Sequence, residues 1–233
     1  MSKKLSRKTR EKRKWGQGHG KDYHPYITAN EFARGRGTRA MEKDWKTGRT
    51  VHLMSMGERK VWLILNFMDN VKEIREQFPL DFDEVNKVRK ELGYCPITNK
   101  EMVKTTDFLV TRTDGTEVAI SVKNSKSDLN YENVLRSLKV EKEYWIRHGV
   151  KYYIIFSSEI NSMLAENIYR VTRYFDVNDV FDATSAMKHL IATKKFPMTK
   201  EELSQKLDFS AMAEANLTSA TIKKMIVDHS DDF

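Results

Sequence analysis

Cysteine is almost absent from this sequence, since its 233 residues contain only Cys95. A lone cysteine excludes an internal disulfide and a cysteine-rich zinc site. No apolar run approaches the roughly 18 residues that a membrane-spanning helix needs, and no signal peptide precedes the predicted elements. We therefore expect a cytoplasmic protein that does not enter a membrane. The length predicts one large domain, or one substantial domain with a small second one.

Acidic residues are outnumbered: 41 Lys and Arg face 33 Asp and Glu, a formal net charge of +8. The basic excess gathers near the N-terminus in the run KKLSRKTREKRK, which contains one acid, Glu11. Such a run predicts a disordered arm that binds DNA phosphates through charge and counterion release. The alternative is a solubilising tail. The predicted DNA-binding residues are Lys3, Lys4, Arg7, Lys8, Arg10, Lys12, Arg13 and Lys14.

Glycine, proline and hydrophobic periodicity divide the rest of the chain into segments. Residues 15–40 predict an irregular, extended segment. A hairpin follows from RAMEKDW and RTVHLMS, then a buried helix over 57–69, a strand over 71–78 and a surface helix over 82–93. A second hairpin over 105–123, a helix over 129–149 and a buried strand over 151–157 come next. This order predicts an α/β fold with a mixed sheet.

From about residue 160 onward the pattern is helical. We expect helices over 180–196, 199–207 and 218–228, and Thr199 and Glu202 have the spacing of a capping box. Three short helices of this kind suit a helix-turn-helix module. A purely structural three-helix cap is the alternative.

The stretch TTDFLVTRTDGTEVAISVK, residues 105–123, predicts two strands whose register depends on the turn. A two-residue turn would mix polar and apolar side chains on both faces. A three-residue turn, with Gly115 left-handed in a bulge, instead gives one nearly apolar face, so we choose that register. This face holds Thr106, Phe108, Val110, Val118, Ile120 and Val122. The other face carries Asp107 opposite Ser121, with Lys123 one step further along.

Two further acids point toward the same corner of the sheet. Glu58 and Glu141 each lie at helical spacing on an apolar stripe, so both are expected to point inward. Inward carboxylates are costly unless something compensates their charge. A Mg²⁺ ion, with Lys123 beside a phosphate, is one compensation. The alternative is a structural salt bridge, Asp107–Lys123 or Glu141–Lys123.

The motifs GQGHGKDY, KTGR with HLMSMGE, EIREQFPL, TTDFLV, SVK and VEKEYW occur in series across residues 16–170. In this series the chain resembles the TnsA-like endonuclease subunits of heteromeric transposases. These subunits have a restriction-endonuclease-like nuclease core of the PD-(D/E)xK type. With the basic DNA-binding arm expected over 1–15, the resemblance implies this nuclease domain over 16–171 and a small helical partner-binding domain over 172–233.

The resemblance also implies a set of roles. Glu58, Asp107 and Lys123 match the catalytic acids and lysine, the Val122 carbonyl matches a metal ligand beside Glu58 and Asp107, and Glu141 matches an accessory acid. The implied cofactor is Mg²⁺, with Mn²⁺ as a substitute. The implied reaction is hydrolysis of double-stranded DNA at the 5′ ends of a transposon, in the bacterial cytoplasm. The implied partners are the transposase subunit TnsB and the ATPase regulator TnsC.

Ser121 departs from the family pattern, because that position usually carries Glu or Asp, or Gln in TnsA. A serine places less charge on a metal, so we expect its hydroxyl to assist catalysis by holding a water. Two other functions stay open at this stage. One is a DNA-binding scaffold subunit that cleaves poorly, and the other is a stand-alone nuclease or junction resolvase.

Overall fold

The computed structural model describes residues 5–31 and 38–172. The chain divides after Ile160 into two units, and the sheet lies wholly in the first. Its helices are α1 (Arg7–Lys12), α2 (Met56–Phe67), α3 (Phe82–Glu91) and α4 (Glu132–Arg147). Its strands are β1 (Ala40–Lys43), β2 (Thr50–Leu53), β3 (Val71–Pro79), β4 (Thr105–Arg112), β5 (Glu117–Lys123) and β6 (Lys151–Phe156). The 3₁₀ turns are η1 (Gly20–Asp22), η2 (Ala29–Glu31), η3 (Lys126–Asn130) and η4 (Ser157–Glu159).

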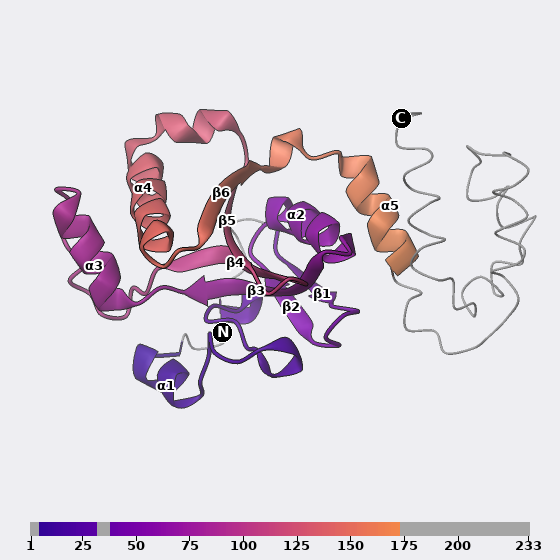
Figure 1. The fold of residues 1–233 in the computed structure, drawn as a ribbon, viewed down its shortest axis with the longest axis horizontal. Helices are drawn as coiled ribbons and strands as arrows, with labels where there is room; N and C mark the ends of the chain where they lie inside the picture. Colours follow the sequence, from indigo (N-terminus) through magenta and orange to yellow (C-terminus); the bar gives the residue numbers. More distant parts are fainter. Residues whose placement is uncertain (1–4, 32–37, 173–233) are drawn as a thin grey trace, which may run out of the picture. The chain divides into compact units, whose positions relative to one another are not determined.

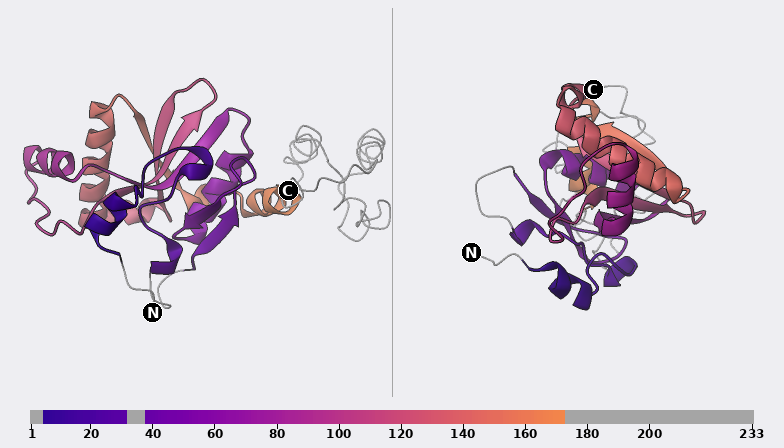
Figure 2. Two further views of the ribbon diagram at one scale, coloured as in Figure 1. Left: turned by 90° about the horizontal axis from the view of Figure 1, so that it is seen from below. Right: turned by 90° about the vertical axis from the view of Figure 1, so that its left-hand side faces the viewer.

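A four-stranded sheet in the order β3–β4–β5–β6 forms the centre of this unit (Figure 1). β3, β4 and β5 are antiparallel neighbours, and β6 runs parallel to β5. The sheet is therefore mixed, as predicted. α2 and α4 lie on opposite sides of it, and α3 lies beside α4 (Figures 1 and 2). Both faces are covered, which is why β4 and β5 are buried along most of their length.

The core on the α4 side comes from four elements. Leu109 of β4 and Ala119 of β5 pack with Tyr144 and Trp145 of α4 and with Val85 of α3. All five are almost inaccessible to solvent. Burying a large apolar side chain contributes about 1.5–3 kcal/mol. This packing fixes α4 over the strand ends discussed below.

The segment before the sheet covers the outer edge of β3. The Tyr23 hydroxyl donates to the Glu76 carbonyl at 2.8 Å, and the Tyr26 N–H donates to the Gln77 carbonyl at 3.3 Å. Gly16, with φ of 78°, lies so close to Pro79 that a Cβ there would be 2.3 Å from the proline Cγ. Only glycine allows this approach. The predicted irregular segment is thus fixed to the end of β3.

The basic run is folded from Leu5 onward, which corrects the expectation of a disordered arm. Ser6 caps α1 by accepting from the Thr9 N–H at 3.3 Å. Arg10 is 2% exposed, and its guanidinium bonds both carboxylate oxygens of Glu31 and the Tyr26 carbonyl. A buried cation needs such partners. Arg10 holds α1 on the domain, a role that a count of basic residues could not reveal.

The remaining predictions about the ends of the chain have different outcomes. Lys3, Lys4 and the helices predicted over 180–228 lie outside the described residues. α5 (Ser162–Thr172) begins the second unit, and the Asn161 side chain accepts from the Met163 and Leu164 N–H groups at its start. No helix in residues 5–31 or 38–172 is both long and apolar enough to cross a membrane.

Candidate active site

The β4–β5 hairpin has the predicted three-residue turn. Gly115 has φ of 84°, and its N–H donates to the Arg112 carbonyl at 3.0 Å. The Arg112 N–H in turn donates to the Thr116 carbonyl at 2.8 Å. The strand pairs include Val110 with Val118 and Phe108 with Ile120. The register chosen from the apolar face is confirmed.

The strand pairing is interrupted next to Asp107. β3 and β4 pair Glu76 with Phe108 and Phe78 with Thr106, but the intervening Gln77 and Asp107 do not form a pair. Gln77 has φ of 49°, in the left-handed region. The β4–β5 pairs also end at Phe108. The side chains therefore stop alternating regularly where Asp107 lies.

Thr106 shows the effect of this interruption, and its predicted face is wrong. We placed it with Phe108 on the apolar face, which a regular strand would require. Instead its hydroxyl donates to Glu141 Oε1 at 3.0 Å and accepts from Trp145 Nε1 at 2.8 Å, so it contacts α4. The break in the ladder is the physical reason.

Asp107, Val122 and Lys123 form one group. The Val122 N–H donates to Asp107 Oδ2 at 2.7 Å, and Lys123 Nζ donates to the Val122 carbonyl at 2.9 Å. Lys123 Nζ also lies 3.9 Å from Asp107 Oδ2. The acid and base that open and close the hairpin strands are thus brought together. Their side chains are 20% and 27% exposed, which leaves the group accessible to a ligand.

Glu58 lies in the first turn of α2, which follows the N-cap residue Ser55, and contacts that residue. Ser55 Oγ accepts from the Glu58 N–H at 3.0 Å and donates to Glu58 Oε1 at 3.2 Å. Glu58 Oε2 accepts from the Met54 N–H at 2.9 Å and from Gln77 Nε2 at 3.3 Å. The carboxylate is buried, as its helical stripe predicted. Three donors to the carboxylate hold it in one orientation.

The electrostatics of the two acids are unusual. Burial, and after it the negative charge of Asp107, raise the pKa of Glu58 to about 8. Burial also raises the pKa of Asp107, while the Lys123 ammonium opposes that shift. Each carboxyl thus holds its proton more tightly than in water, because burial disfavours the ionised form. A bound cation would reverse this.

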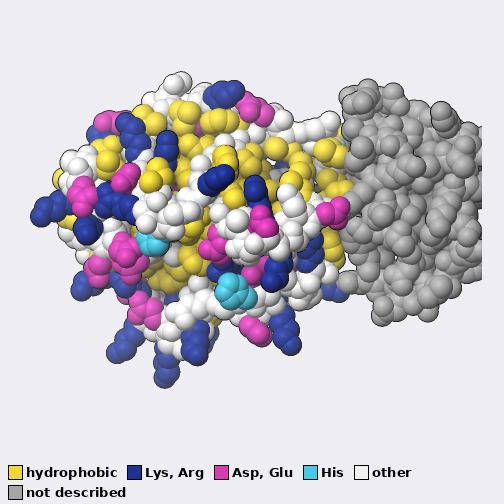
Figure 3. Space-filling model, viewed as in Figure 1, with side chains coloured by type: hydrophobic (Ala, Val, Ile, Leu, Met, Phe, Trp, Pro, Cys, Tyr) yellow, Lys and Arg dark blue, Asp and Glu magenta, His cyan; other side chains and the backbone are white. Residues whose placement is uncertain are grey.

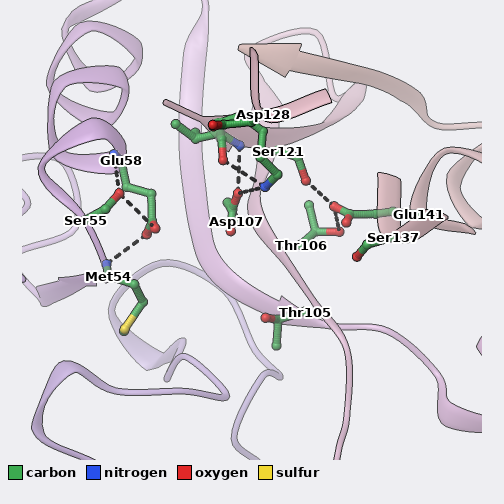
Figure 4. A network of polar contacts seen from close by, with 12 residues as sticks. Met54, Ser55, Glu58, Thr105, Thr106, Asp107, Ser121, Asp128, Ser137 and Glu141 are labelled. Carbon is green, nitrogen blue, oxygen red and sulfur yellow. Dashed lines mark hydrogen bonds and ion pairs between the residues drawn. The ribbon is translucent and has the colours of Figure 1, made fainter. Parts of the chain in front are cut away.

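Glu141 and Ser121 pair with each other and not with Lys123. Figure 4 shows Asp107 between Glu58, which comes from α2, and Ser121 with Glu141 of α4. Ser121 Oγ donates to Glu141 Oε1 at 2.5 Å, and Lys104 Nζ lies 3.0 Å from Glu141 Oε2. Of the two structural ion pairs considered from sequence, the structure brings Asp107 and Lys123 within 3.9 Å. Glu141 uses Lys104 as its cation.

Comparisons with known proteins show what this chain is similar to. Residues 68–157 match the family described as TnsA-like endonuclease N terminal. The chain is also 38% identical over 169 residues to the transposon Tn7 transposition protein TnsA of Escherichia coli. That match covers 70% of this chain and 60% of the relative.

The chain is TnsA-like. It spans about 60% of the length of the curated relative that it matches. The matched family segment includes Asp107, Val122 and Lys123, whereas Glu58 precedes it. The mixed sheet with helices on both faces is consistent with the restriction-endonuclease-like fold that the sequence suggested.

The TnsA-like domain offers oxygen ligands of the kind that Mg²⁺ prefers. Within the described ranges no three His, Cys, Asp or Glu side chains gather closely enough to hold a metal. The predicted set, however, has two carboxylates, Glu58 and Asp107, and one backbone carbonyl, that of Val122. These are hard oxygen donors. Lys123 Nζ already contacts the carbonyl, so the group accommodates positive charge, and its residues fit a divalent cation.

Three residues of the TnsA-like site were missed by sequence reasoning. Gln77 contacts Glu58 from β3, Lys104 neutralises Glu141, and Thr106 bonds Glu141 beside Asp107. The signal for Thr106 and Lys104 is their position just before Asp107 in sequence. Gln77 stands in the motif EIREQFPL, yet nothing in that run predicts a left-handed residue.

Proposed function

We propose that this TnsA-like chain is a metal-dependent DNA endonuclease that acts as one subunit of a transposase. It would hydrolyse the non-transferred strands at the 5′ ends of a transposon. The observation that carries the proposal is the group formed by Asp107, the Val122 carbonyl and Lys123, together with the buried carboxyl of Glu58, whose pKa the charge of Asp107 helps to raise. The similarity to the Tn7 transposition protein TnsA supports the transposase setting.

The residues have separate tasks in this proposal. Glu58, Asp107 and the Val122 carbonyl would hold Mg²⁺ or Mn²⁺, which would act as a Lewis acid toward a phosphate. Lys123, 27% exposed, would donate to a phosphate oxygen and stabilise the charge that develops there. The Val122 N–H fixes the Asp107 carboxylate at 2.7 Å, so little rearrangement is needed on binding. Ser121 and Glu141 would support the group from the α4 side.

DNA would be held mainly through its phosphates. Lys8, Lys12, Arg13 and Lys14 are exposed in and after α1, and basic side chains gather at the lower edge of the molecule, where α1 lies (Figure 3). We leave Arg10 out of this surface because its guanidinium is buried against Glu31. Phosphate contacts carry no sequence information. Choice of the transposon end would therefore come from TnsB, and activation from TnsC.

The deciding experiment is strand cleavage on transposon-end DNA with purified TnsB and TnsC in Mg²⁺. Asp107→Asn keeps an oxygen that can accept from the Val122 N–H but removes the charge, so we expect cleavage to be lost while DNA binding stays. Asp114→Asn, in the turn of the same hairpin, is the matched control and should cleave like the unaltered chain. Wild-type cleavage by Asp107→Asn would refute the assignment.

The same assay separates two other functions. In a scaffold subunit the unaltered chain would not cleave even with partners, and Ser121 in place of the usual acid is the observation that favours this candidate. A stand-alone nuclease or junction resolvase would cleave without TnsB and TnsC.

A further inference from the structure

Gln77 has a backbone conformation that its residue type disfavours. Among the described residues other than glycine, only Lys14 and Gln77 have positive φ, 56° and 49°. Lys14 is exposed, whereas Gln77 is 4% exposed and lies within β3. A left-handed non-glycine residue inside a strand costs free energy and persists only where its surroundings impose it. The conformation therefore calls for a local cause.

The left-handed backbone changes which way the Gln77 side chain points. In a regular strand Gln77 would share a face with Arg75, and Phe78 would take the other face. Instead Arg75 lies over the Phe78 ring at 5.1 Å, and Phe78 packs against Trp145 of α4 at 5.9 Å. Glu76 bonds Arg49 while Gln77 bonds Glu58. The side chains of Glu76 and Gln77, which are neighbours in sequence, thus both point away from α4.

Both ends of the Gln77 amide are engaged. Nε2 donates to Glu58 Oε2 at 3.3 Å, and Oε1 accepts from Thr105 Oγ1 at 3.1 Å. The Thr105 hydroxyl therefore decides which end of the amide faces Glu58, because only the NH₂ group can donate. The Tyr26 N–H holds the Gln77 carbonyl at 3.3 Å. The side chain is fixed at both its tip and its backbone.

We propose that Gln77 is a positioning residue for the Glu58 carboxylate, set by its left-handed backbone to prepare Glu58 for a divalent cation. This inference rests on the proposed function, since it concerns the same site. The Gln77 amide holds Oε2 of Glu58 at β3. The neighbouring strand, β4, carries Asp107. Without the amide, Glu58 would keep its capping contacts in α2 but lose the contact that ties it to the sheet.

The test is calorimetric titration of the full chain with Mn²⁺, without DNA, together with thermal melting in a chelator. Gln77→Gly removes the amide and its two hydrogen bonds but adopts φ of 49° freely, so relief of backbone strain offsets part of the loss and we expect the variant to melt cooperatively. Mn²⁺ should bind about tenfold or more weakly, as is typical when a ligand loses its hydrogen-bond support. Thr105→Val should weaken binding less, and the double variant should resemble Gln77→Gly. Gln17→Gly, at an exposed glutamine, is the control.

A second variant keeps the test decisive if Gln77→Gly does not fold. Asparagine tolerates the left-handed region, so Gln77→Asn should fold. Its side chain is one methylene shorter and does not reach Glu58 in the same way, so the variant should show the same loss of Mn²⁺ affinity. Wild-type affinity in either folded variant would overturn the inference and leave Gln77 a packing feature. Asp107→Asn should abolish Mn²⁺ binding. If the unaltered chain does not bind Mn²⁺, or if Asp107→Asn still binds it, the proposed function itself fails.

Discussion

Ser121 and Lys123 are two residues apart on β5, yet the structure gives them different surroundings. Ser121 is buried and its hydroxyl donates to Glu141, whereas Lys123 is partly exposed beside Asp107. Ser121→Ala leaves a buried carboxylate with one donor fewer, so we expect a loss of about 1–3 kcal/mol in stability. Cleavage should fall only about tenfold, equal to about 1.4 kcal/mol of barrier.

Lys123→Ala should behave in the opposite way. It removes a partly exposed side chain, so the melting temperature should change little, while single-turnover cleavage in Mg²⁺ should fall far more than for Ser121→Ala. Comparing both variants by melting and by single-turnover kinetics checks the pair. If Ser121→Ala is as inactive as Lys123→Ala, serine is a principal catalytic group. If Lys123→Ala cleaves normally, Asp107 and Lys123 form only a structural pair.

Glu58 gives the metal-free protein a pH-dependent stability. Its folded pKa is raised to about 8, above that of the unfolded chain, which is about 4.3. Between these values the folded state retains a proton that the unfolded state has lost, so stability falls as pH rises from about 4.3 to about 8. The total is on the order of a few kcal/mol. Above the folded pKa this contribution is constant.

Melting in a chelator between pH 5 and 9 checks this expectation. Glu58→Gln cannot titrate, so its melting temperature should lose the part of the pH slope that Glu58 contributes. Saturating Mg²⁺ should also flatten the slope in the unaltered chain, because it favours the ionised carboxylate. Equal slopes for the unaltered chain and Glu58→Gln would show that Glu58 ionises normally.

At the scale of one element, α1 combines two uses of basic residues. Arg10→Ala would leave Glu31 buried without its cation, and breaking a buried pair typically costs 3–5 kcal/mol, roughly. Neutralising Lys8, Lys12, Arg13 and Lys14 together should leave melting unchanged and weaken binding to all DNA sequences alike. Each lost phosphate contact should reduce the slope of log K against log salt by about 0.9. Melting curves and salt titrations measure both effects.

The outcome of the salt titration distinguishes the two interpretations of α1. An unchanged slope in the fourfold variant would mean that these side chains only solubilise the protein. A drop in melting temperature as large as that of Arg10→Ala would mean that the exposed residues also support the fold.

The elements show what the sequence could and could not reveal. The β4–β5 register was predictable because the alternating apolar side chains on either side of the turn and Gly115 constrain it, and so was the inward direction of Glu58. The ladder break was not, because the run VKEIREQF reads as a regular strand and glutamine seldom signals a left-handed residue. Folding of α1 was also hidden, since Arg10 resembles its basic neighbours and its partner Glu31 lies far along the chain.

For the whole molecule, the site depends on elements that are complete before residue 160. The sheet, α2 and α4 all belong to the first unit. We therefore expect a chain truncated after Thr172 to melt cooperatively and to bind Mn²⁺ like the full chain. Assembly with TnsC should be impaired, since we assign partner binding to residues 172–233. Pull-down with TnsC and melting of the truncated chain test this. An insoluble truncated chain would place the C-terminal residues within the core.

Cys95 is exposed after α3, and its carbonyl accepts from Arg89 Nε at 2.7 Å. It is the chain's only cysteine, so a maleimide dye would attach at one known position of the unaltered protein. Nearby, Ile97 is fixed through its N–H and carbonyl by the Asn86 side chain, which limits the motion of the labelled segment. A dye there, paired with one on a DNA end, would give a fluorescence distance ruler for assembly without any substitution.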